Sequence, residues 1–354
     1  MAREGVKVFV MSSPVTMDYY IGLNEDGGER LLAYFVKVDG GERLICPALT
    51  ANQARRHGLN EVAEWRDGQD PWPMVGSLFE EWGVQGSTVA VEDDCRASVL
   101  LGLMSVSPAS RFVTGGLLVA DGARVKDAEE LGRLREAGRM ADQAFGPVLA
   151  KLEPGITETE VARLLTAEMS ALGGTPVFAI VATGPNGAEP HHHSDATPLE
   201  TGHVVIMDFG CDFKGYKSDI TRTVCLGQPS QEASDVYGIV HEAFMAARRE
   251  IGPGTPASAV DQAARSVIER AGFGEFFVHR TGHGLGMKIH EEPYIRHGND
   301  EPLRVGEVFS VEPGIYLPGK FGVRIENIVT VTQSGHESLN EEPSPALRQA
   351  SPRP

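Results

Sequence analysis

The spacing of apolar residues changes about one third of the way along the chain. Before that point, short runs at residues 8–11, 31–38 and 88–92 are rich in β-branched or aromatic residues and bounded by turn residues, which predicts strands. Between them, residues 51–56 and 73–82 carry apolar side chains at helical spacing. This alternation predicts a mixed α/β unit.

A long amphipathic helix marks the beginning of a second unit. Apolar residues recur at intervals of three and four between Leu131 and Val148, after a polar stretch. We therefore expect one domain over residues 1–122 and a second over residues 123–340. The final segment, residues 341–354, contains four prolines and few apolar residues, so we expect it to be disordered.

The second domain is expected to combine helices and strands, which makes the chain α+β. Thr157 followed by Glu160 has the pattern of a capping box that opens a helix. The periodicity predicts further helices at residues 232–251 and 256–271, and strands at residues 204–207, 221–225, 308–312 and 323–331.

Charge and composition limit the partners of the chain. The sequence has 49 acidic and 32 basic residues, and its net charge of −17 repels phosphate backbones and anionic lipid head groups. The four cysteines show no CxxC spacing, which is typical of reduced thiols. The apolar run at residues 8–11 is too short for a signal sequence or a membrane span. We expect a cytoplasmic protein that binds neither nucleic acid nor membrane.

Two aspartates are the first candidate for chemistry. Asp208 follows the apolar run 204–207 and is expected to end a buried strand, where an unpaired carboxylate would cost several kcal/mol. Gly210 and Gly215 can form a turn between neighbouring strands, so Asp208 and Asp219 could converge. Taken alone, the pair would more often be ordinary turn residues.

A histidine and two glutamates change that interpretation. His283 lies between glycines, where the backbone can approach a ligand closely, and His290 follows seven positions later. Glu312 and Glu326 each follow an apolar strand and need a compensating partner. Four carboxylates and one imidazole suit two divalent ions about 3.5 Å apart. Hard oxygen ligands favour Mn²⁺ or Co²⁺, with Zn²⁺ as the alternative.

With this set the sequence resembles the pita-bread metallopeptidases, the group of methionine aminopeptidase, aminopeptidase P and prolidase. The order Asp, Asp, His, Glu, Glu at intervals of 11, 64, 29 and 14 residues carries the resemblance. It implies a pita-bread catalytic domain behind a smaller creatinase-like N-terminal domain, and a homodimer. It also implies the metal ligands, which are Asp208, Asp219, His283, Glu312 and Glu326.

The resemblance implies metal-assisted hydrolysis of a peptide bond. Glu312 would accept a proton from the attacking water, and His290 would donate to the developing oxyanion. His191, the first of three consecutive histidines, would contact the region of the scissile bond. All three are therefore candidate catalytic residues.

The segments around Tyr216 and Arg324 resemble the proline-specific branch, so both are candidate substrate-binding residues for small proline-containing peptides. Some prolidases carry an arginine directly after the HExP motif, where this chain has Tyr294. Arg296 and Arg43 could replace it as the partner of the substrate carboxylate, and the sequence favours Arg43.

The predicted function is therefore that of an Xaa-Pro dipeptidase, a hydrolase that uses two divalent ions per chain. Aminopeptidase P activity on longer peptides is the alternative. A non-catalytic peptide- or protein-binding homologue is more remote, because such homologues have typically lost ligands that this chain retains.

Overall fold

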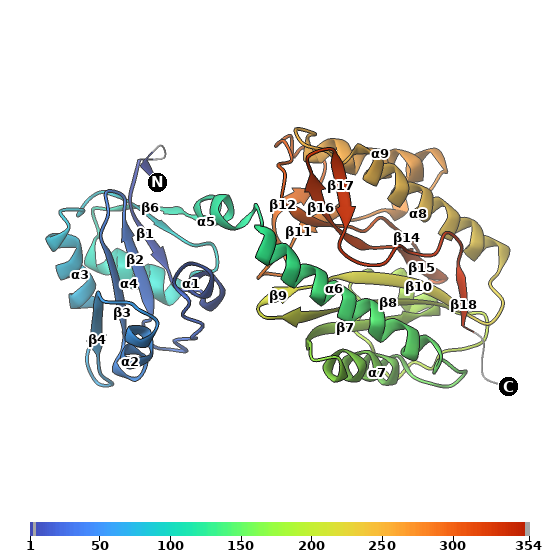
Figure 1. Ribbon diagram of the computed structural model, residues 1–354, viewed down its shortest axis with the longest axis horizontal. Helices are drawn as coiled ribbons and strands as arrows, with labels where there is room; N and C mark the ends of the chain where they lie inside the picture. Colours follow the sequence, from blue (N-terminus) through green and yellow to red (C-terminus); the bar gives the residue numbers. More distant parts are fainter. Residues whose placement is uncertain (3–4, 351–354) are drawn as a thin grey trace. The chain divides into compact units, whose positions relative to one another are not determined.

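The computed structural model describes residues 1, 2 and 5–350, and it contains two compact units (Figure 1). The first unit is Met1–Ala123 and the second begins at Arg124, one residue beyond the boundary expected from the sequence. No helix within the described ranges is long and apolar enough to cross a membrane.

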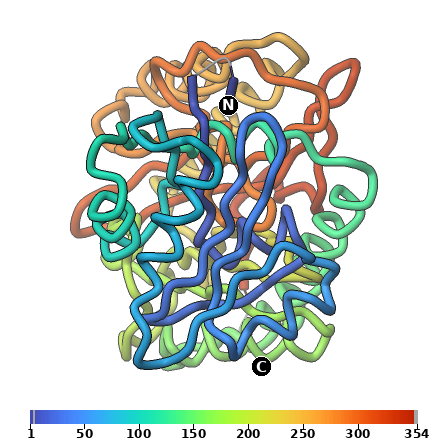
Figure 2. Tube along the Cα trace, turned by 90° about the vertical axis from the view of Figure 1, so that its left-hand side faces the viewer, coloured from blue at the N-terminus to red at the C-terminus, as the bar shows by residue number. Residues whose placement is uncertain are grey.

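The first unit contains a six-stranded mixed sheet of order β4-β3-β2-β1-β5-β6. The chain of this unit is coloured from blue to blue-green in Figure 2. The strands are β1 (Val6–Met11), β2 (Ala33–Lys37), β3 (Glu42–Pro47), β4 (Val62–Trp65), β5 (Thr88–Val91) and β6 (Arg111–Thr114). The helices are α1 (Pro14–Ile21), α2 (Ala48–Arg56), α3 (Trp72–Glu81), α4 (Ala97–Val106) and α5 (Gly116–Ala123).

Helices cover both faces of this sheet, and the side chains of β1 point alternately into the two apolar clusters that lie beneath these helices. Val8 and Val10 pack in the cluster that contains residues of α3 and α4, including Phe79. Phe9 and Met11 pack in the other cluster, with residues of α1 and α2. Successive side chains of a strand point to opposite faces, so a strand buried on both sides reads as one continuous apolar run.

The second unit contains two five-stranded sheets and a two-stranded sheet. The first sheet has the order β18-β10-β8-β7, with β9 paired to β8. Its strands are β7 (Thr175–Thr183), β8 (Val204–Phe213), β9 (Tyr216–Lys217), β10 (Ile220–Leu226) and β18 (Arg348–Ala350). Its apolar face packs against α6 (Ala128–Leu149) and α7 (Glu158–Ala171).

The second sheet has the order β12-β11-β13-β16-β17, and β14 pairs with β15. An apolar cluster joins β13 and β16 to α8 (Gln231–Glu250) and α9 (Ala257–Arg270). The strands are β11 (Gly282–Gly284), β12 (Glu291–Ile295), β13 (Val308–Val311), β14 (Gly314–Leu317), β15 (Phe321–Arg324), β16 (Asn327–Thr332) and β17 (Gly335–Ser338). Each five-stranded sheet is thus covered by a pair of helices, as expected for an α+β domain.

The structure corrects two expectations about strands. Asp208 does not end its strand: β8 continues to Phe213, because the turn forms at Lys214 and Gly215, which both have positive φ. The single strand expected over residues 323–331 is two strands in different sheets, since the chain leaves β15 after Arg324 and enters β16 at Asn327.

The expected disorder of the C-terminal segment is wrong for its described part. Strand β18 lies parallel to β10, with Gln349 opposite Cys225, and Ala350 is buried. Main-chain pairing to a sheet edge requires no particular side chain, so the proline-rich composition did not reveal this strand. Residues 351–354 lie outside the described residues.

Candidate active site

A cavity of about 690 Å³ in the second unit brings together all five predicted metal ligands. His191, His290 and Arg324 also line it, together with His279 and Arg280, which the sequence did not single out. Apolar residues from β7, among them Phe178 and Ile180, complete the wall. The cavity therefore has a polar, titratable wall and an apolar wall, as substrate pockets commonly do.

The ligands reach the cavity from both five-stranded sheets and from the two-stranded sheet. Asp208 lies within β8 and opposite Thr221 of β10, and Asp219 lies between β9 and β10. His283 is on β11, Glu312 directly follows β13, and Glu326 lies between β15 and β16. Ligand atoms of Asp219, His283 and Glu326 lie within 4.8 Å of one another.

The imidazole of His283 is oriented to act as a ligand through Nε2. Its Nδ1 is 3.1 Å from the carbonyl oxygen of Gly284, so Nδ1–H donates and the lone pair is on Nε2. Nε2 lies 3.3 Å from Glu312 Oε1 and 3.5 Å from Asp219 Oδ2. Burial lowers the pKa of His283 to about 3, which keeps the ring neutral.

The four carboxylates have too few positive partners for their charge. Burial and the neighbouring carboxylates raise the pKa values of Asp219 and Glu326 well above their ordinary values, and burial raises the pKa of Glu312 to about 7. Asp208 Oδ2 accepts a hydrogen bond from Arg324 Nη2 at 2.7 Å, whereas its buried Oδ1 has no partner among the described residues. A buried cluster of this composition fits hard divalent cations.

Hydroxyl groups orient the glutamates. Thr221 Oγ1 donates to Glu326 Oε2 at 2.7 Å and accepts from Arg324 Nε at 3.0 Å. Ser310 Oγ donates to Glu312 Oε1 at 3.1 Å and accepts from the backbone N–H of His283. Such partners fix the orientation of metal-binding side chains.

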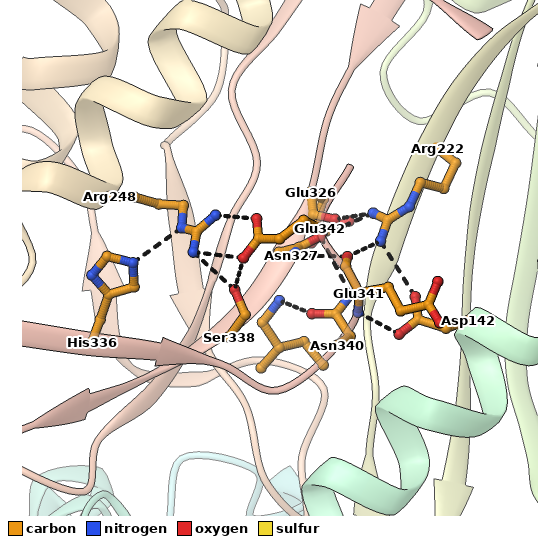
Figure 3. Close-up of polar contacts among 11 residues, drawn as sticks. Asp142, Arg222, Arg248, Glu326, Asn327, His336, Ser338, Asn340, Glu341 and Glu342 are labelled. Atoms are coloured by element: carbon orange, nitrogen blue, oxygen red, sulfur yellow. Dashed lines mark hydrogen bonds and ion pairs between the residues drawn. The ribbon is translucent and has the colours of Figure 1, made fainter. Parts of the chain in front are cut away.

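A buried arginine holds the backbone at Glu326 (Figure 3). Arg222 Nη1 donates to the carbonyl oxygen of Glu326 at 2.6 Å and to Asn327 Oδ1 at 3.0 Å. Its Nη2 donates to the carbonyl oxygen of Glu341 at 2.7 Å and to Asp142 Oδ1 at 3.3 Å. The break between β15 and β16 is therefore tied to α6 and to the chain after β17.

A second chain of hydrogen bonds leads from Asp208 to His279. Arg324 Nη1 donates to Tyr316 Oη at 2.9 Å, and Tyr316 Oη lies 2.8 Å from His279 Nε2. Nδ1 of His279 lies 2.7 Å from the carbonyl oxygen of Arg280, so Nδ1–H donates there and Nε2 accepts from Tyr316. Burial lowers the pKa of His279 to about 3, consistent with this neutral tautomer.

The loop that carries His191 is held by Glu158, which is fully buried at the start of α7. Its Oε1 accepts from the backbone N–H of Thr183 at 2.8 Å and from Asn186 Nδ2 at 3.1 Å. Its Oε2 accepts from the backbone N–H of Asp195 at 3.1 Å and pairs with His192 Nε2 at 2.7 Å. His192 thus points away from the cavity that the adjacent His191 lines.

Two predicted substrate-binding residues are not among the described residues that line this cavity. Tyr216 is buried beside Leu134 and Leu285, and its hydroxyl donates to Glu130 Oε1 at 2.8 Å. Arg43 is on β3 of the first unit, where its guanidinium pairs with Glu61 and Glu81. Arg324 does line the cavity, but the contacts of its guanidinium described above are with protein groups.

Sequence reasoning missed His279, Arg280, Tyr316 and Glu158 as parts of the site. A signal existed for the first two, because His279 and Arg280 directly precede the motif Thr281-Gly282-His283. The partners of Tyr316 and Glu158 are distant in sequence, so no local pattern marks them.

Comparison with known families decides the classification. The model of the Creatinase/Prolidase N-terminal domain matches residues 1–122, and that of Metallopeptidase family M24 matches residues 132–333. The chain belongs to metallopeptidase family M24. The five donors of this M24 peptidase therefore lie within the matched catalytic domain, in the cavity described above.

Individual proteins support the family assignment. A curated relative, "Xaa-Pro dipeptidase" from Lactobacillus helveticus, is 34% identical over 93% of this chain and 91% of its own length. The crystal structure of dipeptidase PepE from Mycobacterium ulcerans has a TM-score of 0.93 at 37% identity, covering 99% of this chain and 95% of that one. An X-Pro aminopeptidase from Thermotoga maritima has a TM-score of 0.81 at 31% identity and covers 98% of both chains. The M24 peptidase thus has the pita-bread catalytic domain of its neighbours, preceded by a creatinase-like N-terminal domain.

Proposed function

We propose that this M24 peptidase is an Xaa-Pro dipeptidase that uses two divalent metal ions. The observation that carries the proposal is the complete donor set, four carboxylates and the Nε2 of His283, in one cavity of about 690 Å³. The similarity to a curated Xaa-Pro dipeptidase along nearly the whole chain supports the substrate class. An intact donor set argues against a purely binding role.

Asp208, Asp219, His283, Glu312 and Glu326 would hold the ions. When bound, two such ions lower the pKa of a shared water, which makes hydroxide available near neutral pH. Mn²⁺ or Co²⁺ is the proposed metal, because four of the five ligands are carboxylates, and Zn²⁺ is the alternative.

Glu312 is the proposed proton acceptor. Its carboxylate lies beside Nε2 of His283 and is oriented by Ser310. Burial raises its pKa to about 7, so before ions bind the group is poised to exchange a proton near neutral pH.

The two remaining histidines would act on the substrate. The rings of His290 and His283 are perpendicular, with centroids 4.1 Å apart, so His290 faces the cavity directly beside the ligands. From there it would donate to the developing oxyanion of the scissile carbonyl. His191, on the loop held by Glu158, would contact the scissile-bond region and steady the departing amine.

A comparison of three substrates tests the function. Metal-loaded protein should hydrolyse Met-Pro, and should hydrolyse the tripeptide Met-Pro-Gly much more slowly. Equal or faster cleavage of the tripeptide would assign aminopeptidase P activity instead, as the name of the Thermotoga maritima neighbour suggests. Met-Ala is the matched control for proline, and failure to cleave any of these peptides would contradict peptidase activity.

Two further parts of the proposal concern the whole protein. We propose a homodimer, which light scattering during gel filtration would test at micromolar concentration. We also propose a cytoplasmic location, in line with the four free cysteines. Fractionation of cells that produce the full chain would test it.

A further inference from the structure

Two guanidinium groups line the cavity, and they differ in the hydrogen bonds that they make with other protein groups. Arg324 is fully engaged, because it donates to Asp208, Tyr316 and Thr221. The guanidinium of Arg280 has no hydrogen bond or ion pair with any residue in the described ranges. Arg280 therefore presents an unpaired cation with five N–H donors to the space that the substrate would occupy.

The ring of Tyr294 holds Arg280 in place. The central carbon of the guanidinium lies 4.5 Å from the centroid of the Tyr294 ring, a cation–π contact. Tyr294 is on β12, and His283 of β11 is its register partner, so the contact is built on the same strand pair as a metal ligand. Stacking of this kind leaves the N–H edge of the guanidinium available for a planar anion.

The position of Arg280 also suits contact with the leaving-group half of a substrate. Its backbone carbonyl accepts from His279, which ends the hydrogen-bond chain from Asp208. Arg280 and His290, the ring that would meet the scissile carbonyl, line the same cavity. The carboxylate of a dipeptide is separated from that carbonyl by a single residue.

We propose that Arg280, stacked on Tyr294, binds the C-terminal carboxylate of the dipeptide and so determines selectivity for dipeptides. This inference rests on the proposed Xaa-Pro dipeptidase function. It replaces Arg43 and Arg296 as the carboxylate anchor, because Arg43 pairs with Glu61 and Glu81, and Arg296 is exposed and donates to the carbonyl of His297. Tyr294, which departs from the arginine of some prolidases, becomes the support of an arginine placed elsewhere.

The test pairs a substrate that has the carboxylate with one that lacks it. Steady-state kinetics of wild type, Arg280→Gln and Arg280→Lys are measured with Met-Pro and with its amide, Met-Pro-NH₂. Arg280→Gln should lower kcat/KM for Met-Pro about 10- to 150-fold, the effect of losing a charge-assisted pair, mainly through KM. The amide should change less than about threefold, which also reports that the variant is folded and metal-loaded.

Two more variants test whether the charge of Arg280 alone is sufficient and whether the effect is specific to this arginine. Arg280→Lys should recover part of the loss on Met-Pro, because it keeps the charge but loses the bidentate fork and the stacking. Arg296→Gln is the matched control, and it should leave kcat/KM for both substrates within about twofold of wild type. Metal content of each variant should equal that of wild type.

The possible failures are distinguishable. If wild type cleaves Met-Pro faster than the amide but Arg280→Gln lowers both equally, or lowers neither, Arg280 is not the anchor and the dipeptidase function stands. If wild type cleaves acid and amide equally, no carboxylate is recognised and the inference is overturned, while Xaa-Pro cleavage stands. If metal-loaded wild type cleaves neither, the proposed function fails and this inference fails with it.

Discussion

Glu158 Oε2 and His192 Nε2 lie 2.7 Å apart, beneath the loop that carries His191 into the cavity. The carboxylate also accepts from two backbone N–H groups and one amide, so four donors from residues 183–195 converge on one buried side chain. The first turn of α7, where Glu158 lies, thereby holds the loop that carries His191, which has little regular structure. The relationship predicts that Glu158 positions His191 without contacting the substrate.

Glu158→Gln should therefore lower kcat about 10-fold or more and leave KM and metal content near wild type. Glutamine removes the negative charge and places an NH₂ group, which cannot accept a hydrogen bond, opposite N–H donors. Leaving these donors unpaired should reduce the free energy of unfolding by about 1–3 kcal/mol. Kinetics, metal analysis and denaturant unfolding measure these three effects.

The matched control is Glu160→Gln, two residues further along the same helix. Glu160 is exposed and completes the capping box with Thr157, a role that glutamine also fills. It should leave kcat unchanged. A wild-type kcat in Glu158→Gln, or an equal loss in both variants, would contradict the positioning role.

Metal removal should abolish activity. Metal analysis should find two divalent ions per chain, and a chelator should reduce turnover of Met-Pro by at least about 10³-fold, with recovery on adding Mn²⁺ or Co²⁺. Asp219→Asn removes one buried carboxylate from the donor set and should lower both the ion count and the activity. Full turnover by chelated protein, or by Asp219→Asn, would show that the metal assignment is wrong.

Three of the five metal ligands could be predicted from the residues because each follows an apolar run, and the family resemblance implied the complete set. Asp208 follows four apolar residues, and Glu312 and Glu326 follow apolar strands, so each charge needed a partner that the local sequence does not supply. The long helices were equally visible, since their apolar stripes repeat at 3.6-residue spacing. Periodicity and desolvation are local signals, and a single sequence contains them.

The supporting residues could not be predicted because their partners are distant. Arg324 and Asp208 are 116 positions apart, and Arg222 and Glu326 are 104 apart. Only the folded sheets bring each pair together, so sequence alone left Arg324 as a substrate-binding candidate. Arg280 had a local signal, because it directly precedes the motif Thr281-Gly282-His283, but its stacking on Tyr294 becomes visible only when β11 and β12 pair.

Replacement of His290 should separate chemistry from metal binding. His290→Ala should lower kcat by about 10²-fold or more, the usual effect of losing a preorganised oxyanion donor. The ion count should stay at two, because Nε2 of His283, rather than His290, faces Asp219 and Glu312. Kinetics and metal analysis on the same preparation test this, and loss of metal with turnover recovered after reconstitution would contradict the assigned role.

Stability of the metal-free protein should depend on pH in a direction fixed by the buried carboxylates. Burial and mutual repulsion raise the pKa values of Asp219 and Glu326 well above their ordinary values, and burial raises that of Glu312 from 4.5 to about 7. Between these values the folded chain binds more protons than the unfolded chain. Stability from this site is therefore fully present below about pH 4.5 and is lost as pH rises through 7.

Bound cations favour the ionised carboxylates, so the Tm difference between metal-loaded and metal-free protein should widen from about pH 5 to about pH 8. Each kcal/mol is worth about 2–4 °C in a domain of this size, so the widening should reach several degrees. Asp219→Asn is the control for titration elsewhere in the chain, because its metal-free form has one fewer buried acid and should lose less Tm over the same range. Calorimetry at fixed ionic strength would measure all three series. If the Tm of the metal-free wild type rises with pH relative to the Tm of metal-free Asp219→Asn, these carboxylates are ionised and paired without metal. That result would contradict the excess of negative charge inferred for the site.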